Sequence, residues 1–245
     1  MYGVKRKSKS KKGSNKGKGK GKGKGTSKKG GNDKNSKKKK IEKQVADVMK
    51  LIQSFRQMII CNRKNEVSTC LICWSDGACK DNPGESGCGC FIEFVSSSSD
   101  DSKSEEKSAN TIERYKYIGR SKSGLCELLA FELVLDTLIS LAGTNIGTTP
   151  GWKRKNVHIL SDSTYCVNMF TKNWNAKENI EEVARIVKKF TLVKSIFNIV
   201  TLNWVPAHQG IPGNEKADEL ANLAVSTKSS SIDIDINRGI DDRKT

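Results

Sequence analysis

Apolar residues between positions 69 and 225 follow first the spacing of strands and then, in turn, the spacing of helices. Short apolar or alternating runs predict strands, because successive side chains of a strand point to opposite faces. Apolar residues three or four positions apart predict helices with one buried face. The predicted strands are 69–75, 87–95, 111–119, 157–160 and 198–205, and the predicted helices are 125–141, a short one from about 164, 178–194 and 213–225. Three consecutive strands followed by strand–helix units predict a mixed α/β (α+β) fold, with a five-stranded mixed sheet and helices on both of its faces.

An amphipathic helix and a linker are predicted before this region, over residues 41–65. The apolar stripe of the helix consists of Ile41, Val45, Val48, Ile52, Phe55 and Ile59, which recur at helical spacing. Packing of the stripe on the following domain, predicted over residues 66–226, is the simpler interpretation. Contact with a partner protein or with a second copy is the alternative. The sequence does not fix the oligomeric state, and a monomer is the default expectation.

The positive charge of the chain is concentrated in its first 40 residues, which are mostly Lys, Gly and Ser. They contain 18 of the Lys and Arg residues and one acid, Asp33, whereas residues 41–245 contain 26 basic and 26 acidic residues. Because Gly is flexible and the lysines repel one another, residues 1–40 are predicted to form a disordered tail. A polycation of this kind binds a nucleic-acid backbone without sequence preference. A nuclear address or a solubilising tail is the alternative, and the polar residues 227–245 are predicted to form a second flexible tail.

The cysteines and the lack of long apolar runs bear on the compartment. No apolar run approaches the roughly 20 residues of a membrane helix, so no membrane association is expected. Cys70 and Cys73 form a C-x-x-C motif, and Cys88 and Cys90 form a C-x-C motif. Positions three apart on a strand face opposite ways, which disfavours a shared zinc ion, although zinc binding stays open. Reduced, packed thiols indicate an intracellular protein, in the cytoplasm or the nucleus.

Four acidic residues occupy places where a carboxylate needs compensation. Asp76 and Asp162 each follow a buried apolar strand, Glu127 lies near the start of an apolar helix, and Asp218 lies on the last helix. A buried carboxylate is costly unless a cation or hydrogen bonds compensate it. Taken singly, each has an ordinary explanation as a turn or cap residue. Their value as a set comes from the motifs around them.

These motifs, in this order, resemble those of the ribonuclease H family. Ser75-Asp76-Gly77 with Asn82-Pro83-Gly84 resembles the opening strand and turn, Cys126-Glu127-Leu128-Leu129-Ala130 the second motif, and Leu160-Ser161-Asp162-Ser163-Thr164-Tyr165 the third. The fourth is the most specific and consists of Trp204-Val205-Pro206-Ala207-His208 followed by Gly213-Asn214-Glu215-Lys216-Ala217-Asp218-Glu219-Leu220-Ala221. The likeness covers about residues 68–226.

The resemblance implies a ribonuclease H-like fold and an endonuclease that cuts the RNA strand of RNA–DNA hybrids, leaving 5′-phosphate and 3′-hydroxyl ends. It implies two Mg²⁺ ions, with Mn²⁺ as a substitute, held by Asp76, Glu127, Asp162 and Asp218. His208 matches a family residue that assists proton transfer and product release. Asn82 matches a position that contacts the nucleic acid, and Ser123, Ser163 and Thr164 are further substrate-binding candidates beside the site.

The chain also departs from the family pattern. No pair of Asn residues precedes Glu127, and the segment between Asp162 and His208 is too short for the extra basic helix of bacterial members. These losses predict weak substrate binding by the domain itself, which the basic tail would compensate. The competing functions are a nucleic-acid-binding protein without catalysis, a relative of the ribonuclease domain of reverse transcriptases, and another nuclease of the same fold.

Overall fold

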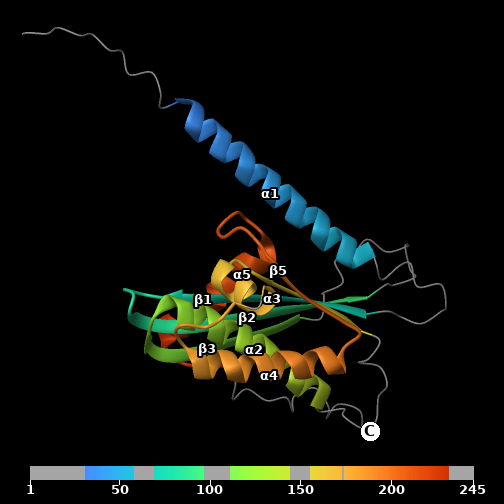
Figure 1. Ribbon diagram of the computed structural model, residues 1–245, viewed down its shortest axis with the longest axis vertical. Helices are drawn as coiled ribbons and strands as arrows, with labels where there is room; N and C mark the ends of the chain where they lie inside the picture. Colours follow the sequence, from blue (N-terminus) through green and yellow to red (C-terminus); the bar gives the residue numbers. More distant parts are fainter. Residues whose placement is uncertain (1–30, 58–68, 97–110, 144–154, 173, 232–245) are drawn as a thin grey trace, which may run out of the picture. The chain divides into compact units, whose positions relative to one another are not determined.

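The computed structural model describes residues 31–57, 69–96, 111–143, 155–172 and 174–231 (Figure 1). The chain divides into a unit Met1–Lys38 and a unit Lys39–Thr245, and the second contains the sheet. The strands are β1 (Thr69–Cys79), β2 (Gly84–Ser96), β3 (Thr111–Ser121), β4 (Asn156–Ser161) and β5 (Ile199–Trp204). The helices are α1 (Gly31–Gln57), α2 (Ser123–Gly143), α3 (Thr164–Thr171), α4 (Ile180–Ile196) and α5 (Pro212–Thr227).

The strands form one sheet in the order β3-β2-β1-β4-β5. β1 and β3 are both antiparallel to β2, whereas β1, β4 and β5 run parallel. The predicted five-stranded mixed sheet is therefore confirmed. Parallel pairing places the carboxyl ends of β1 and β4 side by side, because Ser75 pairs with Ser161 in the register.

Alternate residues of β1 point into two different apolar clusters. Leu71 and Cys73 pack with the apolar side chains of α2, α3 and α4. Cys70, Ile72 and Trp74 pack on the other face, against residues of α1 and α5. Helices therefore cover both faces of the sheet, as predicted. Cys70 and Cys73 lie on opposite faces, and the described cysteines are free thiols.

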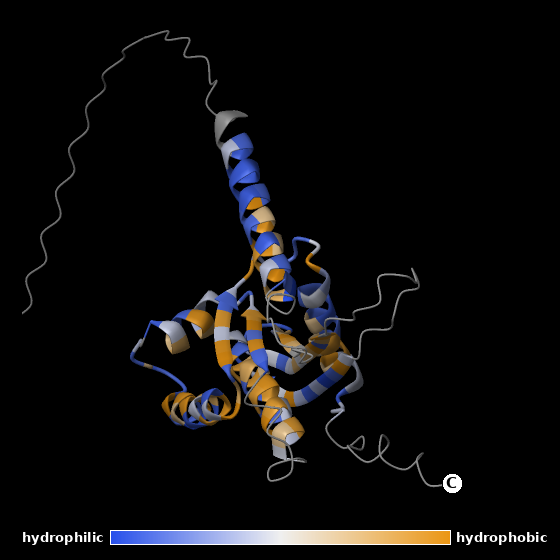
Figure 2. Cartoon of the chain, turned by 90° about the vertical axis from the view of Figure 1, so that its right-hand side faces the viewer, coloured by the Kyte–Doolittle hydropathy of each residue, from blue (hydrophilic) through white to orange (hydrophobic). Residues whose placement is uncertain are grey.

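Helix α1 is longer than predicted. It begins at Gly31, ten residues before the expected start at residue 41, so residues 31–40 are helical rather than part of a disordered tail. Residues 1–30 and Ile59 lie outside the described ranges. Figure 2 shows hydrophilic residues over most of the amino-terminal half of α1 and apolar residues among those of its carboxy-terminal half. Val48, Ile52 and Phe55 are buried against the sheet face, whereas Ile41 is exposed.

The segment after α5 is attached to β3, which corrects the prediction of a flexible tail starting at residue 227. Ser229 accepts a hydrogen bond at its carbonyl from the Tyr117 amide, and the Ser231 amide donates to the Tyr115 carbonyl. Ser231 also accepts from the Tyr115 amide through its hydroxyl, at 2.7 Å. These bonds occupy part of the open edge of the sheet, which otherwise exposes unpaired backbone groups. Residues 232–245 lie outside the described ranges.

His158 on β4 is a buried core residue, as its strand position suggests, but only one of its ring nitrogens is satisfied. Nδ1 lies 2.8 Å from the Thr201 hydroxyl, whereas Nε2 has no partner among the described residues. Burial lowers the pKa of His158 to about 4. The Phe55 ring stacks on the imidazole with 3.6 Å between centroids. No helix in the described part of the chain is long and apolar enough to cross a membrane.

Replacing Phe55 tests whether the second half of α1 belongs to the folded domain. Because this side chain is 4% exposed and stacks on His158, Phe55→Ala should lower the free energy of unfolding by about 3–5 kcal/mol. Met49→Ala, on the exposed side of the same helix, should change it by less than about 0.5 kcal/mol. Urea unfolding of the two variants measures both values. Equal, small effects would mean that α1 does not pack on the sheet.

Candidate active site

The four predicted carboxylates come from four elements that meet at the carboxyl ends of β1 and β4. Asp76 lies within β1, which continues to Cys79, and Asp162 directly follows β4. Glu127 is in the second turn of α2, and Asp218 lies in the middle of α5. The charge of each of the other three raises the pKa of Asp76, so the structure brings all four together.

Two glycines allow the helices to approach the strand that carries Asp76. A Cβ atom at Gly77 would lie 2.6 Å from the Cys126 carbonyl carbon, so the start of α2 rests directly on β1. Gly89 is the register partner of Asp76 on β2, and a Cβ there would lie 2.0 Å from the Ala217 oxygen. Because Glu127 and Asp218 directly follow Cys126 and Ala217, these two contacts hold both carboxylates near Asp76.

Burial and mutual repulsion make the ionised forms of these groups costly. Burial raises the pKa of Asp76 to about 8, together with the charges of Asp162, Asp218 and Glu127, although the Gly77 amide donates to its Oδ1 at 2.7 Å. Burial also raises the pKa of Asp162 and of Glu127. Like charges at short range disfavour ionisation unless an opposite charge is present.

Neutral hydrogen-bond donors orient three of the four carboxylates. The Ser163 hydroxyl donates to Glu127, and the Asn214 amide donates to Asp162 Oδ2 at 3.1 Å. Asn222 donates to Asp218 Oδ1 at 2.9 Å. The sequence analysis missed the roles of Asn214 and Asn222. Asn214 stands inside the fourth motif, but only the folded chain shows that it is buried beside Asp162.

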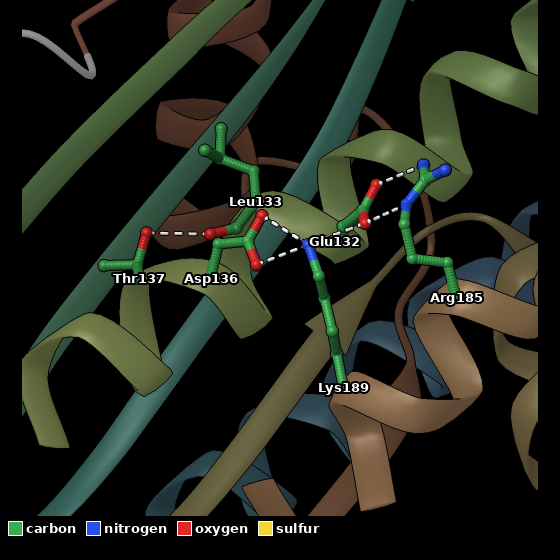
Figure 3. Close-up of polar contacts among 6 residues, drawn as sticks. All are labelled: Glu132, Leu133, Asp136, Thr137, Arg185 and Lys189. Atoms are coloured by element: carbon green, nitrogen blue, oxygen red, sulfur yellow. Dashed lines mark hydrogen bonds and ion pairs between the residues drawn. The ribbon is translucent and has the colours of Figure 1, made fainter. Parts of the chain in front are cut away.

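A buried carboxylate elsewhere in the domain shows what compensation by the protein looks like. Glu132 on α2 is bound by Arg185 at 2.7 Å and by Lys189 at 2.7 Å, both from α4 (Figure 3). Burial raises the pKa of Glu132, but the bonds from the two cations outweigh it and hold that pKa below its usual value. No such cation pairs with the four candidate carboxylates among the described residues, so their charge is left for a ligand.

The remaining candidates occupy different places around this group. His208 lies in the exposed loop before α5 with a φ of 50°, and its positive form lowers the pKa of Asp162. Asn82 and Ser123 contact each other, since the Asn82 amide donates to the Ser123 hydroxyl at 3.1 Å. Ser163 caps α3 by accepting from the Cys166 amide at 3.0 Å, and Thr164 is exposed.

A groove of about 830 Å³ lies beside this site. Its lining includes Asn82 and Ser123, but neither Ser163 nor Thr164. Tyr165 and Trp174 supply aromatic surface, and Trp174 is 51% exposed. The sequence pointed to Asn82 and Ser123, whereas the contribution of Tyr165 depends on how α3 packs beside the first turn of α2.

The carboxylates fit a divalent cation whose coordination is completed by other ligands. Within the described ranges, no three His, Cys, Asp or Glu side chains are arranged to hold a metal ion by themselves. Mg²⁺ commonly binds through one or two carboxylates together with water and substrate phosphates, so a complete protein cage is not required. The raised pKa of Asp76 reflects uncompensated negative charge, which a cation would relieve.

Comparison with known proteins identifies the family. The RNase H family model matches residues 68–226. The ribonuclease H of Francisella philomiragia is 32% identical over 178 residues, which cover 69% of this chain and 97% of that protein. The ribonuclease H of Francisella tularensis subsp. novicida gives the same identity and coverage.

Solved structures give lower scores. The N-terminal RNase H domain of a Mycobacterium tuberculosis protein matches with a TM-score of 0.47 and 22% identity, over 65% of this chain and 96% of that one. LC11-RNase H1, isolated from compost, matches with a TM-score of 0.48 and 23% identity, over 64% of this chain and 96% of that one. From the family model and the curated relatives, the chain belongs to the ribonuclease H family and is a ribonuclease H enzyme.

Proposed function

We propose that this enzyme hydrolyses the RNA strand of RNA–DNA hybrids with two divalent metal ions, leaving 5′-phosphate and 3′-hydroxyl ends. The observation that carries the proposal is the group of four carboxylates around Asp76, whose pKa of about 8 reflects negative charge that the protein leaves uncompensated. Members of the family use divalent metal ions. Carboxylate oxygens suit Mg²⁺, with Mn²⁺ as a substitute.

Asp76, Glu127, Asp162 and Asp218 would hold the metal ions. When bound, the ions would activate the attacking water and stabilise the charge on the leaving oxygen. The residues of the chain position the reacting groups. Asn214 fixes one oxygen of Asp162 and Ser163 fixes one oxygen of Glu127, so the remaining oxygens have defined directions. His208, exposed next to Asp162, is placed to exchange protons with the reacting phosphate and to assist product release.

The groove beside the site would take one strand of the hybrid. Aromatic side chains stack on bases or sugars without regard to sequence, which suits an enzyme that must act on many sequences. Trp174 and Tyr165 supply such surface, and the Asn82–Ser123 pair offers amide and hydroxyl groups at the end near Glu127. Recognition of the RNA strand would rest on its 2′-hydroxyl groups.

The activity is tested with labelled RNA–DNA hybrid, duplex RNA and duplex DNA, each with and without Mg²⁺. Wild type should cleave only the hybrid, and only with the metal ion. Asp76→Asn should lower kcat by at least about 10³-fold, because the metal ions lose a shared ligand. Asp47→Asn, an exposed change on α1, is the matched control and should keep full activity. A wild type as inert as Asp76→Asn would instead indicate a binding protein without catalysis.

The same substitution should have the opposite effect on stability. The Asp76 carboxyl loses its proton near pH 3.8 in the unfolded chain but only near pH 8 in the folded one, so wild-type stability falls as the pH rises between these values. At pH 8 without divalent ions, Asp76→Asn should therefore raise the free energy of unfolding by at least about 1 kcal/mol.

Two further measurements separate this effect from general stabilisation. Below pH 4 the stability difference between Asp76→Asn and wild type should disappear, because the carboxyl is then protonated in both states. Mg²⁺ should raise the Tm of wild type more than that of Asp76→Asn. A gain in stability that is the same at every pH would contradict the electrostatic explanation.

We also propose that the basic tail strengthens substrate binding without choosing the cleavage site. Because α1 begins at Gly31, a deletion of residues 1–30 leaves the helix whole and removes 13 Lys and Arg residues. The deletion should raise KM, leave kcat within about twofold, and make the dependence of binding on log salt shallower. A tail of equal length with Gln in place of these 13 residues should behave like the deletion. An unchanged salt slope would refute the proposal.

A further inference from the structure

A second pocket lies between the edge strand β3 and helix α2, with a volume of about 380 Å³. None of the four carboxylates lines it, and neither do Asn82, Ser123 or Trp174 of the groove beside the active site. Its apolar lining consists of Ile112, Leu129, Leu133 and Leu141. Pockets of this size with mostly apolar walls and a few polar groups are typical of small-molecule sites.

Strand β3 directs two cations to the side of the sheet that α2 covers. Ile112, Arg114 and Lys116 alternate along the strand and therefore share a face. Their register partners on β2 are Ile92, Cys90 and Cys88, which are buried in the cluster beneath α2. The charge of Arg114 lowers the pKa of Cys90, and that of Lys116 lowers the pKa of Cys88, which agrees with this placement.

The acids that line the same pocket are already neutralised. Glu132 is bound by Arg185 and Lys189, and Asp136 lies 2.6 Å from Lys189. Figure 3 shows both carboxylates directed at these cations of α4. The pocket is therefore left with an excess of positive charge on its β3 side.

The two cations of β3 have no acidic partner of this kind. Neither Arg114 nor Lys116 forms an ion pair with another described residue, and Arg114 donates only to the neighbouring Glu113 carbonyl, at 3.2 Å. Charged residues that point inward on an edge strand can serve to prevent aggregation. Here the edge is already occupied at Tyr115 and Tyr117 by residues 229–231, so protection of the edge explains the two cations less well.

We propose that this pocket binds a small anionic amphiphile, a molecule with an apolar body and one carboxylate, sulfonate or phosphate group. The apolar body would contact Leu129, Leu133 and Leu141, and the anionic group would bind Arg114 and Lys116. Ser140, whose hydroxyl has no hydrogen-bond partner among the described residues, lines the pocket and can donate to the same group. The site is separate from the nuclease site, so its test does not depend on nuclease activity.

The proposal is tested with decanoate, below the concentration at which it forms micelles, added to the full-length protein. Binding is read from the NMR signals of the Ile112, Leu129, Leu133 and Leu141 methyl groups, because the lysines of the first 40 residues attract any anion. Decanoate should shift these signals saturably, and decan-1-ol and decyltrimethylammonium should bind at least about tenfold more weakly.

Two substitutions and a control define the site. Arg114→Gln with Lys116→Gln should weaken decanoate binding at least about tenfold. Arg120→Gln, on the same strand but outside the pocket, should leave it unchanged. Ser140→Trp, which fills the rim, should abolish it. Thermal unfolding checks that each variant is folded, and the charge variants alone decide the matter if the Trp variant is not.

Three results would overturn the proposal. Equal binding of decanoate and decan-1-ol would show that the cations play no part. Equal binding by the double variant and by Arg120→Gln would show the same. Binding that appears only after Asp100, Asp101, Glu105 and Glu106 are changed to Asn and Gln would mean that an acidic segment of this chain is the occupant, rather than an external ligand.

Discussion

Electrostatic repulsion among Asp76, Glu127, Asp162 and Asp218 is the constraint on which the arrangement of this domain depends. The sheet, α2 and α5 bring these groups together, and burial and mutual repulsion raise the pKa of Asp76 to about 8. The fold tolerates this cost because the core beneath the site is extensive on both faces of β1. Glu132 shows the contrast, since a buried acid with a purely structural role receives two cations from α4.

The close contact of backbone with backbone is what makes this repulsion unavoidable. Gly77 lets the start of α2 rest on β1, and Gly89 lets α5 rest on β2 opposite Asp76. A side chain at either position would push a helix away from the strand and carry Glu127 or Asp218 with it. The two glycines therefore fix the size of the space that a metal ion and a phosphate can occupy, although neither touches them.

The sequence predicts most of this fold because the apolar periodicity of each element is local. It fails where pairing depends on distant residues. β2 begins at Gly84 rather than at 87, and β1 ends at Cys79 rather than at 75, because the two strands pair along segments that carry glycines instead of alternating apolar residues. Helix α1 reaches back to Gly31 through lysines that favour helix but show no apolar face. The four carboxylates were found by motif order, whereas the Asn214 bond to Asp162 needed the folded chain.

The distribution of charge explains why the substrate-binding surface and the basic segment belong together. Lys122, at the groove beside the active site, is paired with Glu178 at 3.2 Å, so part of the positive charge there is already neutralised. The remaining polar and aromatic lining, from Asn82 to Trp174, offers shape and stacking more than charge. Since residues 41–245 are electrically balanced, attraction of a polyanion must come largely from the 18 basic residues before them. A groove that reads shape and a tail that supplies charge would thus divide between them the work of holding a hybrid.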